Sequence, residues 1–442
     1  MSKVFENIKG TYDYLPQKQI IREQIKSVLQ TEFAKYGFAP AETPILCPYD
    51  LLASKYSEGA DILNEMYKLS DQGKRKLGLR FDLTITFSKL ISSNPDLLLP
   101  FKRYEIGKVF RDGPVKLGRN REFTQCDTDI VGVNSLMAEA EYMMMTNEIY
   151  KKLGLNIEIE FNNRKLLSGI INLVFGTLSE DKLRKSIMLI DKFAKLTEEE
   201  LTNEFRAIVD IKKLPFLREL LNCNFEQLKI KITKLGTNSL IEEGLKEINE
   251  LYTYLKDSET LKIMKFAPYL ARGIDVYTGT VWEVFLKNRQ INDVDFTVSL
   301  GGGGRYDNII TYFIDDGKQY PAVGMSFGLD VIYEALMLDN SDKNIAIADI
   351  YIIPMKTENQ ALKYATKLRE KGIRVEIDKS GRKLVKSMNY ANKLNYPFVI
   401  VLGENEIKTQ KIKIKNMSFG DEQEFTIKNI SSIVKLVNKY KK

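Results

Sequence analysis

The 442-residue sequence contains no histidine, and this absence excludes several kinds of catalytic site. A Ser-His-Asp triad, a Cys-His pair, an HExxH zinc site and a histidine general base all need an imidazole. Any chemistry must therefore use carboxylates, arginines, lysines, backbone amides or a bound metal ion. Two explanations of the absence stay open at this point: a composition biased toward Lys, Ile and Asn, or a functional reason.

Cysteines and long apolar runs are also scarce. The three cysteines, Cys47, Cys126 and Cys223, form no CxxC pair and no disulfide framework, so we expect a reducing, cytoplasmic setting. Apolar runs stay shorter than the roughly 18 residues of a membrane span, and residues 1–10 lack the apolar core of a signal peptide. With 44% hydrophobic and 28% charged residues, the composition is that of a soluble globular protein of two or three domains.

The positive charge is concentrated near the C-terminus. Residues 346–442 contain 20 Lys+Arg and 10 Asp+Glu, whereas the rest of the chain holds 46 basic and 49 acidic residues. A compact basic domain is typical of proteins that bind a polyanion such as nucleic acid, although a solvated lysine-rich surface would have the same composition.

The hydrophobic pattern predicts a first domain at 1–336, a polar linker at 337–345 and a second domain at 346–442. The elements predicted in the first domain are a helix at 17–36, strands at 101–110 and 122–131, a helix at 136–153, a mainly helical insertion at about 166–256, and a strand running into a helix at 323–336. In the second domain, strands at 349–353, 373–377 and 398–402 alternate with helices at 359–371 and 383–393. That alternation predicts an α/β domain with a mostly parallel sheet.

Polar side chains follow one face of several predicted strands. Because side chains alternate between the two faces, residue parity predicts which of them converge. The residues that share a face are Gln125, Asp127 and Asp129 in 122–131, Arg103, Glu105 and Arg111 in 103–111, and Asp82 and Thr84 in a third segment that we expect to be extended. Either a solvated sheet edge or the polar floor of a small-molecule site would have this pattern.

The residue types indicate what such a site would bind. Asp82, Gln125 and Asp129 suit a cationic amine and a ring nitrogen. Guanidinium groups bind phosphates and carboxylates in bidentate fashion, and the candidates are Arg111, Arg119, Arg121 and Arg272. The combination predicts a zwitterionic amino acid together with a nucleotide. The glycines at 301–304 permit a close backbone approach, but they match neither a P-loop nor GxGxxG.

Several segments resemble one family over nearly the whole chain. They are GTYDYLP (10–16), ETPIL (42–46), LRFDLT (79–84), KRYEIGKVFRDGPVKLGRNREFTQCDTDIVG (102–132), LARGIDVYTGTVWE (270–283), GGGGRYDNI (301–309), VGMSFGLDVIYEAL (323–336), KLREKGIRVEID (367–378) and VIVLGENE (399–406). This set resembles the histidyl-tRNA synthetases, which are class II aminoacyl-tRNA synthetases. Segment 102–132 is similar to class II motif 2, whereas ARGIDVYTG followed by GGGGRYDN is specific to the histidine branch.

The resemblance implies a fold, a reaction and partners. The fold would be an α+β catalytic domain, an antiparallel sheet flanked by helices with a helical insertion, followed by an α/β anticodon-binding domain. The reaction would activate L-histidine with ATP and Mg²⁺ to histidyl-adenylate and transfer it to tRNA(His). Segments 10–16 and 42–46 resemble the N-terminal segment and motif 1, a dimer element, so we expect a homodimer. No metal-ligating cluster of the chain itself is expected.

The resemblance also implies roles for individual residues. The histidine pocket would be lined by Asp82, Leu83, Thr84, Arg111, Gln125, Asp129, Arg272, Tyr277 and Tyr306. ATP would be contacted by Arg111, Arg119, Arg121 and Gln125. The catalytic residues would be Arg272 and Arg111, which stabilise charge as the histidine carboxylate attacks the α-phosphorus. Because that carboxylate is already ionised, no general base is required, in agreement with a chain that has no histidine.

The chain departs from the family pattern at two points. The segment 270–283 usually has two tyrosines, and Val276 replaces the first of them. Motif 3 usually contains Glu-Arg, with the arginine on the ATP phosphates, and here the pair is Asp330 and Val331. This loss predicts weaker ATP binding or transition-state stabilisation unless another basic residue substitutes. The form of the pocket segment with Asp82 resembles the archaeal and eukaryotic members.

Two functions are therefore weighed. The first is an active ligase, either a main enzyme or a second, backup copy. The second is a histidine sensor without tRNA charging, similar to the regulatory subunit that partners ATP phosphoribosyltransferase. A recognisable basic C-terminal domain favours the ligase, and Val331 favours the sensor. The missing histidines gain a functional interpretation, because a histidine-free synthetase can be translated when charged histidyl-tRNA is scarce.

Overall fold

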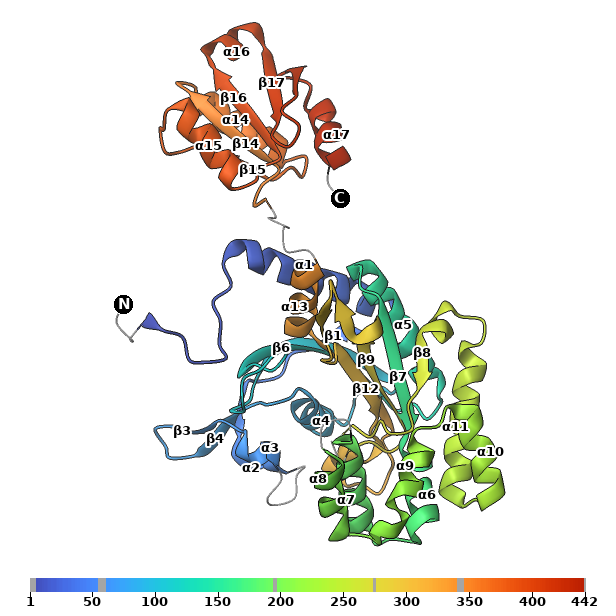
Figure 1. Cartoon of the computed structure of the whole chain (residues 1–442). Helices are drawn as coiled ribbons and strands as arrows, with labels where there is room; N and C mark the ends of the chain where they lie inside the picture. The colour runs from blue at the N-terminus through green and yellow to red at the C-terminus, as the bar shows by residue number, and fades with distance from the viewer. Residues whose placement is uncertain (1–4, 55–60, 194–196, 273–275, 340–345, 441–442) are drawn as a thin grey trace. The chain divides into compact units, whose positions relative to one another are not determined.

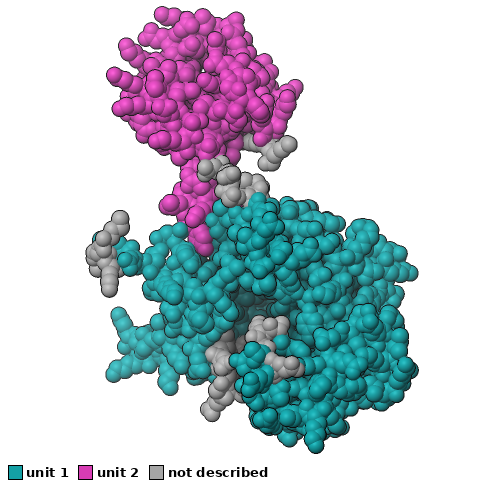
Figure 2. All heavy atoms as spheres, viewed as in Figure 1, with its two compact units in different colours: residues 1–13, 22–339 teal, residues 14–21, 340–442 magenta. Residues whose placement is uncertain are grey.

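A computed structural model describes residues 5–54, 61–193, 197–272, 276–339 and 346–440. The chain forms two compact units, one of residues 1–13 and 22–339 and the other of residues 14–21 and 340–442 (Figure 2). The linker predicted at 337–345 begins inside a helix that continues to Asp339, and its residues 340–345 lie outside the described part of the chain. In the described residues, no helix is long and apolar enough to span a membrane.

The first unit is built on an eight-stranded sheet in the order β1-β5-β6-β13-β12-β9-β7-β8. Its strands are β1 (Ala39–Pro40), β5 (Phe101–Phe110), β6 (Glu122–Val131), β7 (Ile157–Asn163), β8 (Met264–Phe266), β9 (Thr280–Leu286), β12 (Gly301–Arg305) and β13 (Ala322–Gly328). The strands predicted at 101–110 and 122–131 are confirmed at both ends. The sheet is antiparallel except at its two edges, where β1 pairs with β5 and β7 pairs with β8 in parallel.

Helices cover the face of the sheet that carries Cys126 and Thr128, which we call the back face. The helices and the partners they pack on are seen in Figure 1: α1 (Pro16–Lys35), α5 (Met137–Leu153) and α13 (Leu329–Asp339). Phe33 of α1 contacts Phe327 of β13, and Tyr142 of α5 contacts Trp282 of β9. The helices predicted at 17–36 and 136–153 are confirmed to within one residue at each end, since the apolar periodicity of each follows the face that is buried.

The predicted helical insertion is confirmed. Its helices are α6 (Arg164–Phe175), α7 (Glu180–Asp191), α8 (Glu198–Arg206), η2 (Ile211–Lys213), α9 (Leu214–Leu221), α10 (Phe225–Leu235) and α11 (Ser239–Leu255). Asn163 and Asn224 cap two of them through side-chain oxygens, as short polar residues do at helix starts. Figure 1 shows these helices, coloured green to yellow, beside the β7–β8 edge of the sheet. The insertion therefore lies at the sheet edge away from β5 and β6.

Smaller elements complete the first unit. They are α2 (Tyr49–Ala53), α3 (Asp61–Asn64), α4 (Thr84–Ser92), α12 (Asp307–Ile314) and η3 (Glu259–Ile263), a three-stranded sheet of β2 (Leu46–Pro48), β4 (Lys76–Leu79) and β3 (Lys68–Ser70), and η4 (Lys287–Arg289) beside a two-stranded ribbon of β10 (Gln290–Ile291) and β11 (Val294–Asp295). Helices α4 and α12 pack on each other around Phe87, Tyr306 and Ile310.

The second unit contains an α/β sheet in the order β15-β14-β16-β17-β18. Its elements are β14 (Ile350–Met355), α14 (Glu358–Arg369), β15 (Val375–Ile377), α15 (Leu384–Lys393), β16 (Phe398–Gly403), α16 (Glu404–Thr409), β17 (Lys411–Asn416), β18 (Glu422–Thr426) and α17 (Ile430–Tyr440). The three predicted strands pair in parallel, and β17 and β18 add an antiparallel hairpin. All described Lys and Arg side chains of residues 346–440 are exposed except the partly buried Lys415.

Candidate active site

The face of the sheet opposite the back face carries Gln125, Asp127 and Asp129 on β6, and we call it the front face. The three side chains follow every second residue, as the sequence predicted. Gln125 Nε2 donates to Ser326 Oγ of the neighbouring strand β13 at 3.2 Å. Within the described residues, Gln125 Oε1 and Asp127 Oδ1 are buried without a hydrogen-bond partner. Buried polar atoms without partners are rare in folded proteins, so they point to a ligand.

Asp129 is held by a cation and a phenol. The strand register places Arg103 of β5 directly opposite Asp129, and its Nη2 lies 2.8 Å from Asp129 Oδ2. Tyr306, which directly follows β12, donates its hydroxyl to Asp129 Oδ1. Burial and the neighbouring Asp129 carboxylate raise the pKa of Tyr306 well above its usual value, so the phenol remains a donor. Asp129 therefore has its geometry fixed before any ligand binds.

The two aspartates of β6 differ in electrostatic compensation. Burial raises the pKa of Asp127 to about 7, and the neighbouring Asp129 charge raises it further than Arg103 can lower it. Burial also raises the pKa of Asp129, while Arg103 and the Tyr306 hydrogen bond oppose that rise. Among the described residues, Asp127 is thus a carboxylate that changes its charge near neutral pH.

Glycines of β12 leave room for two side chains to lie on the front face. A Cβ on Gly302 would stand 2.0 Å from Arg272 Nη1, and a Cβ on Gly304 would stand 2.6 Å from Tyr277 Cδ1. The glycine run therefore supplies space for a guanidinium and a phenol above the sheet. This is the close approach that the sequence indicated, and the partner is the protein's own side chains.

Arg272 has an unusual backbone and several contacts. Its φ of 48° lies in the left-handed region, which is costly for a residue with a side chain and is found where a site requires it. Its Nη1 donates to the Trp282 carbonyl at 3.0 Å, its Nε lies 3.9 Å from Glu283 Oε1, and its guanidinium lies over the Tyr277 ring at 5.3 Å. Residues 273–275 of the matching motif lie outside the described part of the chain.

The prediction that Asp82 and Thr84 share a face of an extended segment is wrong. Strand β4 ends at Leu79, and Thr84 begins helix α4. Asp82 Oδ1 accepts a hydrogen bond from the Ile85 N–H at 3.1 Å, so the carboxylate caps the first turn of the helix. Leu83 is fully buried, and its carbonyl accepts a bond from Arg103 Nη2 at 3.2 Å. Arg103 thus connects the 82–84 segment to Asp129.

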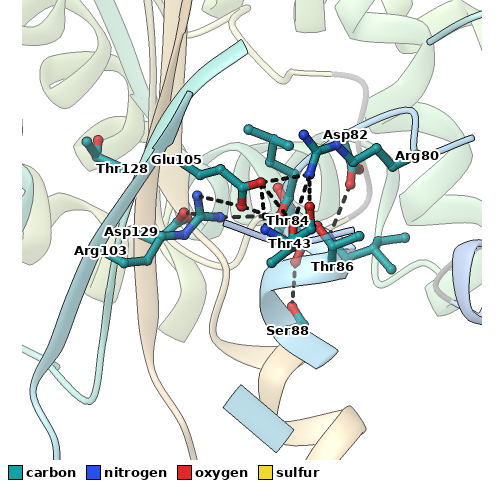
Figure 3. Close-up of polar contacts among 12 residues, drawn as sticks. Thr43, Arg80, Asp82, Thr84, Thr86, Ser88, Arg103, Glu105, Thr128 and Asp129 are labelled. Atoms are coloured by element: carbon teal, nitrogen blue, oxygen red, sulfur yellow. Dashed lines mark hydrogen bonds and ion pairs between the residues drawn. The ribbon is translucent and has the colours of Figure 1, made fainter. Parts of the chain in front are cut away.

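A buried network supports this arrangement (Figure 3). Glu105 of β5 accepts hydrogen bonds from Arg80 Nη1 at 2.7 Å and from the Thr43 backbone N–H at 3.0 Å, and it lies 3.8 Å from Arg103 Nη1. The Arg80 and Glu105 side chains are at most 3% exposed. Because a buried charge without its partner is costly, the network fixes the segment that precedes α4 against β5.

The other predicted arginines lie at the β5–β6 hairpin. Arg111 directly follows β5, stacks on Phe123 of the front face at 5.0 Å and donates to the Phe81 carbonyl at 3.1 Å. Arg119 pairs with Glu65, and Arg121 Nη2 lies 3.3 Å from Asp112 Oδ1. The structure therefore places Arg111 next to the front-face residues, whereas Arg119 and Arg121 pair with carboxylates outside them.

The motif 3 position has a buried ion pair next to Val331. Asp330 Oδ1 lies 2.6 Å from Arg22 Nη1, and its Oδ2 accepts the Thr124 backbone N–H at 2.7 Å. Val331 is 8% exposed, and its Cγ2 lies 3.4 Å from where a Cβ on Gly118 would stand. Val331 therefore contacts the β5–β6 hairpin, and Arg22 is engaged on the back face. Val276, the second departure, packs against the α4–α12 core.

Two residues of the front face were left unassigned by sequence reasoning. Residue parity placed Arg103 and Asp127 on the correct faces, but their roles depend on the β5–β6 register, which the sequence does not reveal. Arg103 stands opposite Asp129, and Asp127 stands opposite Glu105. The one available signal was the spacing of two between Asp127 and Asp129.

Comparisons with known proteins agree with this geometry. The family model described as Histidyl-tRNA synthetase matches residues 10–332, and the model described as Anticodon binding domain matches residues 349–436. The chain belongs to the histidyl-tRNA synthetase family. The first match covers the sheet and the insertion, and the second covers the basic C-terminal α/β unit.

Relatives of this synthetase-family chain match it over nearly its full length. Histidine–tRNA ligase 1 of Bacillus cereus is 46% identical over 431 residues, which are 96% of this chain and 98% of the relative. Histidine–tRNA ligase 2 of Shouchella clausii is 42% identical over 421 residues, 95% of this chain and 97% of the relative. The structure of histidyl-tRNA synthetase from Nostoc sp. PCC 7120 has a TM-score of 0.83 at 25% identity and covers 98% of this chain and 99% of its own.

A further structure is similar in fold alone. An ATP phosphoribosyltransferase regulatory subunit/histidyl-tRNA synthetase from Bacillus halodurans has a TM-score of 0.74 at 22% identity, covering 91% of this chain and 99% of its own. Because fold does not determine function, this similarity does not decide between a ligase and a regulatory subunit.

Proposed function

We propose that the chain is a histidine–tRNA ligase that activates L-histidine with ATP and transfers it to tRNA(His). The observation that carries the proposal is the front face, where carboxylates and an amide oxygen meet the guanidinium of Arg272. A zwitterionic amino acid needs both signs of charge within one site. The family membership and the anticodon-binding unit support the same assignment.

Histidine binds to the front face in this proposal. The pocket residues are Asp82, Leu83, Thr84, Gln125, Asp129, Tyr277 and Tyr306, with Arg111 and Arg272 at the carboxylate side. Asp129 is oriented by Arg103 and Tyr306, so it accepts a substrate N–H without first losing rotamer freedom. This Asp82-type pocket segment is similar to that of the archaeal and eukaryotic members, as the sequence comparison implied.

The adenylation step requires cations more than a base. A carboxylate oxygen of histidine attacks the α-phosphorus of ATP, the bond to the β-phosphate oxygen breaks, and pyrophosphate leaves with its electron pair. Arg272 and Arg111 stabilise the negative charge on the transferring phosphoryl group. The nucleophile is already ionised at neutral pH, so a chain without histidine is competent for this step.

ATP is contacted by Arg111, Arg119, Arg121 and Gln125 in this proposal. Arg119 and Arg121 would exchange Glu65 and Asp112 for phosphate, which is a stronger bidentate partner. Mg²⁺ neutralises phosphate charge when it is bound. Among the described residues, no group of three acidic, cysteine or histidine side chains forms a resident metal site, so we expect Mg²⁺ to arrive with ATP.

The remaining partners follow from the second unit and the family. Its exposed Lys and Arg side chains suit the phosphates of tRNA(His). We expect a cytoplasmic homodimer, as the motif 1 resemblance implies. The regulatory alternative is not favoured, because an anticodon-binding domain is matched and the relatives at more than 40% identity are named ligases.

Two assays test the reaction. Histidine-dependent ATP–pyrophosphate exchange reports adenylation, and charging of tRNA(His) reports transfer. We expect both. Exchange without charging would limit the function to adenylation, and histidine binding without exchange would instead support the sensor.

We further propose that this is a second, backup synthetase used when histidyl-tRNA is scarce. The absence of histidine from all 442 residues supports this, and so do the numbered names of the relatives, ligase 1 and ligase 2. Under histidine limitation, synthesis of the chain should persist while a histidine-rich control protein of equal length declines. An equal decline of both would refute the backup role.

A further inference from the structure

Asp127 is the feature of the front face that the proposed roles leave unused. Its Oδ1 is buried, and within the described residues it has no hydrogen-bond partner. Its neighbour Asp129 has Arg103 on one oxygen and Tyr306 on the other. The strand therefore holds two buried carboxylates two residues apart, one compensated by the protein and one not.

The sheet register places Asp127 in the same row as the groups around Arg272. Asp127 pairs with Ser326 of β13, Ser326 pairs with Gly302 of β12, and Gly302 lies under the Arg272 guanidinium. Paired residues of adjacent strands point to the same face. Asp127 therefore projects from the same floor as Gln125 and Asp129, two strands from Arg272.

We propose that Asp127 is a further histidine-binding residue, whose free carboxylate oxygen accepts an N–H of the bound substrate. This inference rests on the proposed function of the front face as the histidine pocket. Gln125 Oε1, the other unpartnered buried acceptor, lies two residues away on the same face and contributes to the same contact. A purely structural carboxylate would be expected to have a protein donor on each oxygen, as Asp129 does.

The electrostatic environment makes the contact dependent on protons. The charged and titratable groups that face Asp127 are Asp129 on β6, Arg103 and Glu105 on β5, Asp82 before α4, and Arg272 and Tyr277 above β12. Burial and the two neighbouring aspartates raise the pKa of Asp127 to about 7 more strongly than Arg103 lowers it. A substrate cation in contact with Asp127 would lower that pKa again, so histidine binding releases a proton below neutral pH.

Calorimetric titration of the full chain with L-histidine at pH 6, 7 and 8 tests the proposal. We expect the wild-type Kd to rise about tenfold from pH 8 to pH 6, as the carboxylate becomes protonated. Asp127→Asn should raise the Kd at pH 8 about 10- to 100-fold, the usual cost of losing a charged hydrogen bond. Its Kd should lack the wild-type pH dependence.

The comparison of the two proteins removes the main confounding titration. The substrate imidazole itself titrates near pH 6.5, but it does so equally with wild type and with Asp127→Asn. The chain has no imidazole of its own, so no histidine of the protein contributes in this range. A Kd and a pH profile that are unchanged in Asp127→Asn would overturn the proposal.

Two substrate analogues identify the N–H that Asp127 accepts. Imidazolelactate has a hydroxyl in place of the ammonium group, and histidinol retains both the ammonium group and the ring. If Asp127 contacts the ammonium group, Asp127→Asn weakens only histidinol. If it contacts the ring, the variant weakens both analogues alike. Equal binding of both analogues to wild type and variant would contradict either contact.

Controls separate this inference from the pocket itself. Thr128→Val changes a buried residue on the back face of the same strand and should leave the histidine Kd unchanged while reporting any general damage to β6. If wild type itself neither binds histidine nor exchanges pyrophosphate, the proposed function fails. If wild type does both and Asp127→Asn equals it, only the role of Asp127 fails.

Discussion

The two faces of β6 carry polar side chains under opposite conditions. On the back face, Asp330 accepts from Arg22 and from the Thr124 N–H, and Thr128 donates to the Met325 carbonyl. On the front face, buried oxygens of Gln125 and Asp127 have no protein donor within the described residues. One face is therefore internally satisfied, and the other holds acceptors that a ligand can satisfy.

The difference separates residues that stabilise the fold from residues that bind substrate. Satisfied buried pairs are costly to break, because each leaves an unpaired charge behind. Unsatisfied buried acceptors lower stability and are retained where binding requires them. Breaking the back face should cost stability and spare binding, and changing the front face should do the reverse.

The largest effect is expected from Arg272, which lies over the front face. Arg272→Ala should lower ATP–pyrophosphate exchange about 1,000-fold, because a cation placed for the transferring phosphoryl group is lost. The fold should remain, since the change removes a single hydrogen bond, the one to the Trp282 carbonyl. Arg272→Lys, which keeps the charge without the bidentate geometry, should be intermediate. Full exchange by Arg272→Ala would exclude its catalytic role.

On the back face, Arg22→Ala should destabilise the protein by about 3–5 kcal/mol, since it leaves buried Asp330 without its cation. Urea unfolding measures this change. The histidine Kd should stay within about twofold of wild type. The double replacement of Arg22 and Asp330 by Leu should recover part of the stability, because no charge is then buried alone. A lower stability accompanied by a much higher Kd would show that the two faces are coupled.

On the front face, Asp127→Asn should stabilise the protein without ligand. The pKa of this carboxyl rises from an ordinary 3.8 to about 7 on folding, so wild-type stability falls as the pH rises from about 4 to about 7. The amide does not ionise, and the variant should exceed wild type by at most about 4 kcal/mol at pH 8 and match it at pH 4. Urea unfolding at the two pH values measures the difference. A variant less stable than wild type at pH 8 would mean that the protein compensates the charge.

The sequence predicted the front face better than its wiring. Period-two alternation over ten residues identified β5 and β6 to the residue and placed Gln125, Asp127 and Asp129 together. The 80–85 segment misled because a short alternation also fits the first turn of a helix that Asp82 caps. The pairing of Arg103 with Asp129 depends on strand register across an eleven-residue hairpin, which no local pattern specifies.

The smallest effect is expected at Val331, which stands where the family has the motif 3 arginine. Val331→Arg should lower the KM for ATP about three- to tenfold if the missing cation limits binding, because a guanidinium would reach the phosphates beside the β5–β6 hairpin. Its contact with the hairpin near Gly118 makes added bulk a concern, and Val331→Leu is the matched control without charge. ATP–pyrophosphate exchange at varied ATP measures the KM. No gain with Arg would indicate that another basic residue already binds the phosphates, and Arg119 and Arg121 of the same hairpin would be the next to replace.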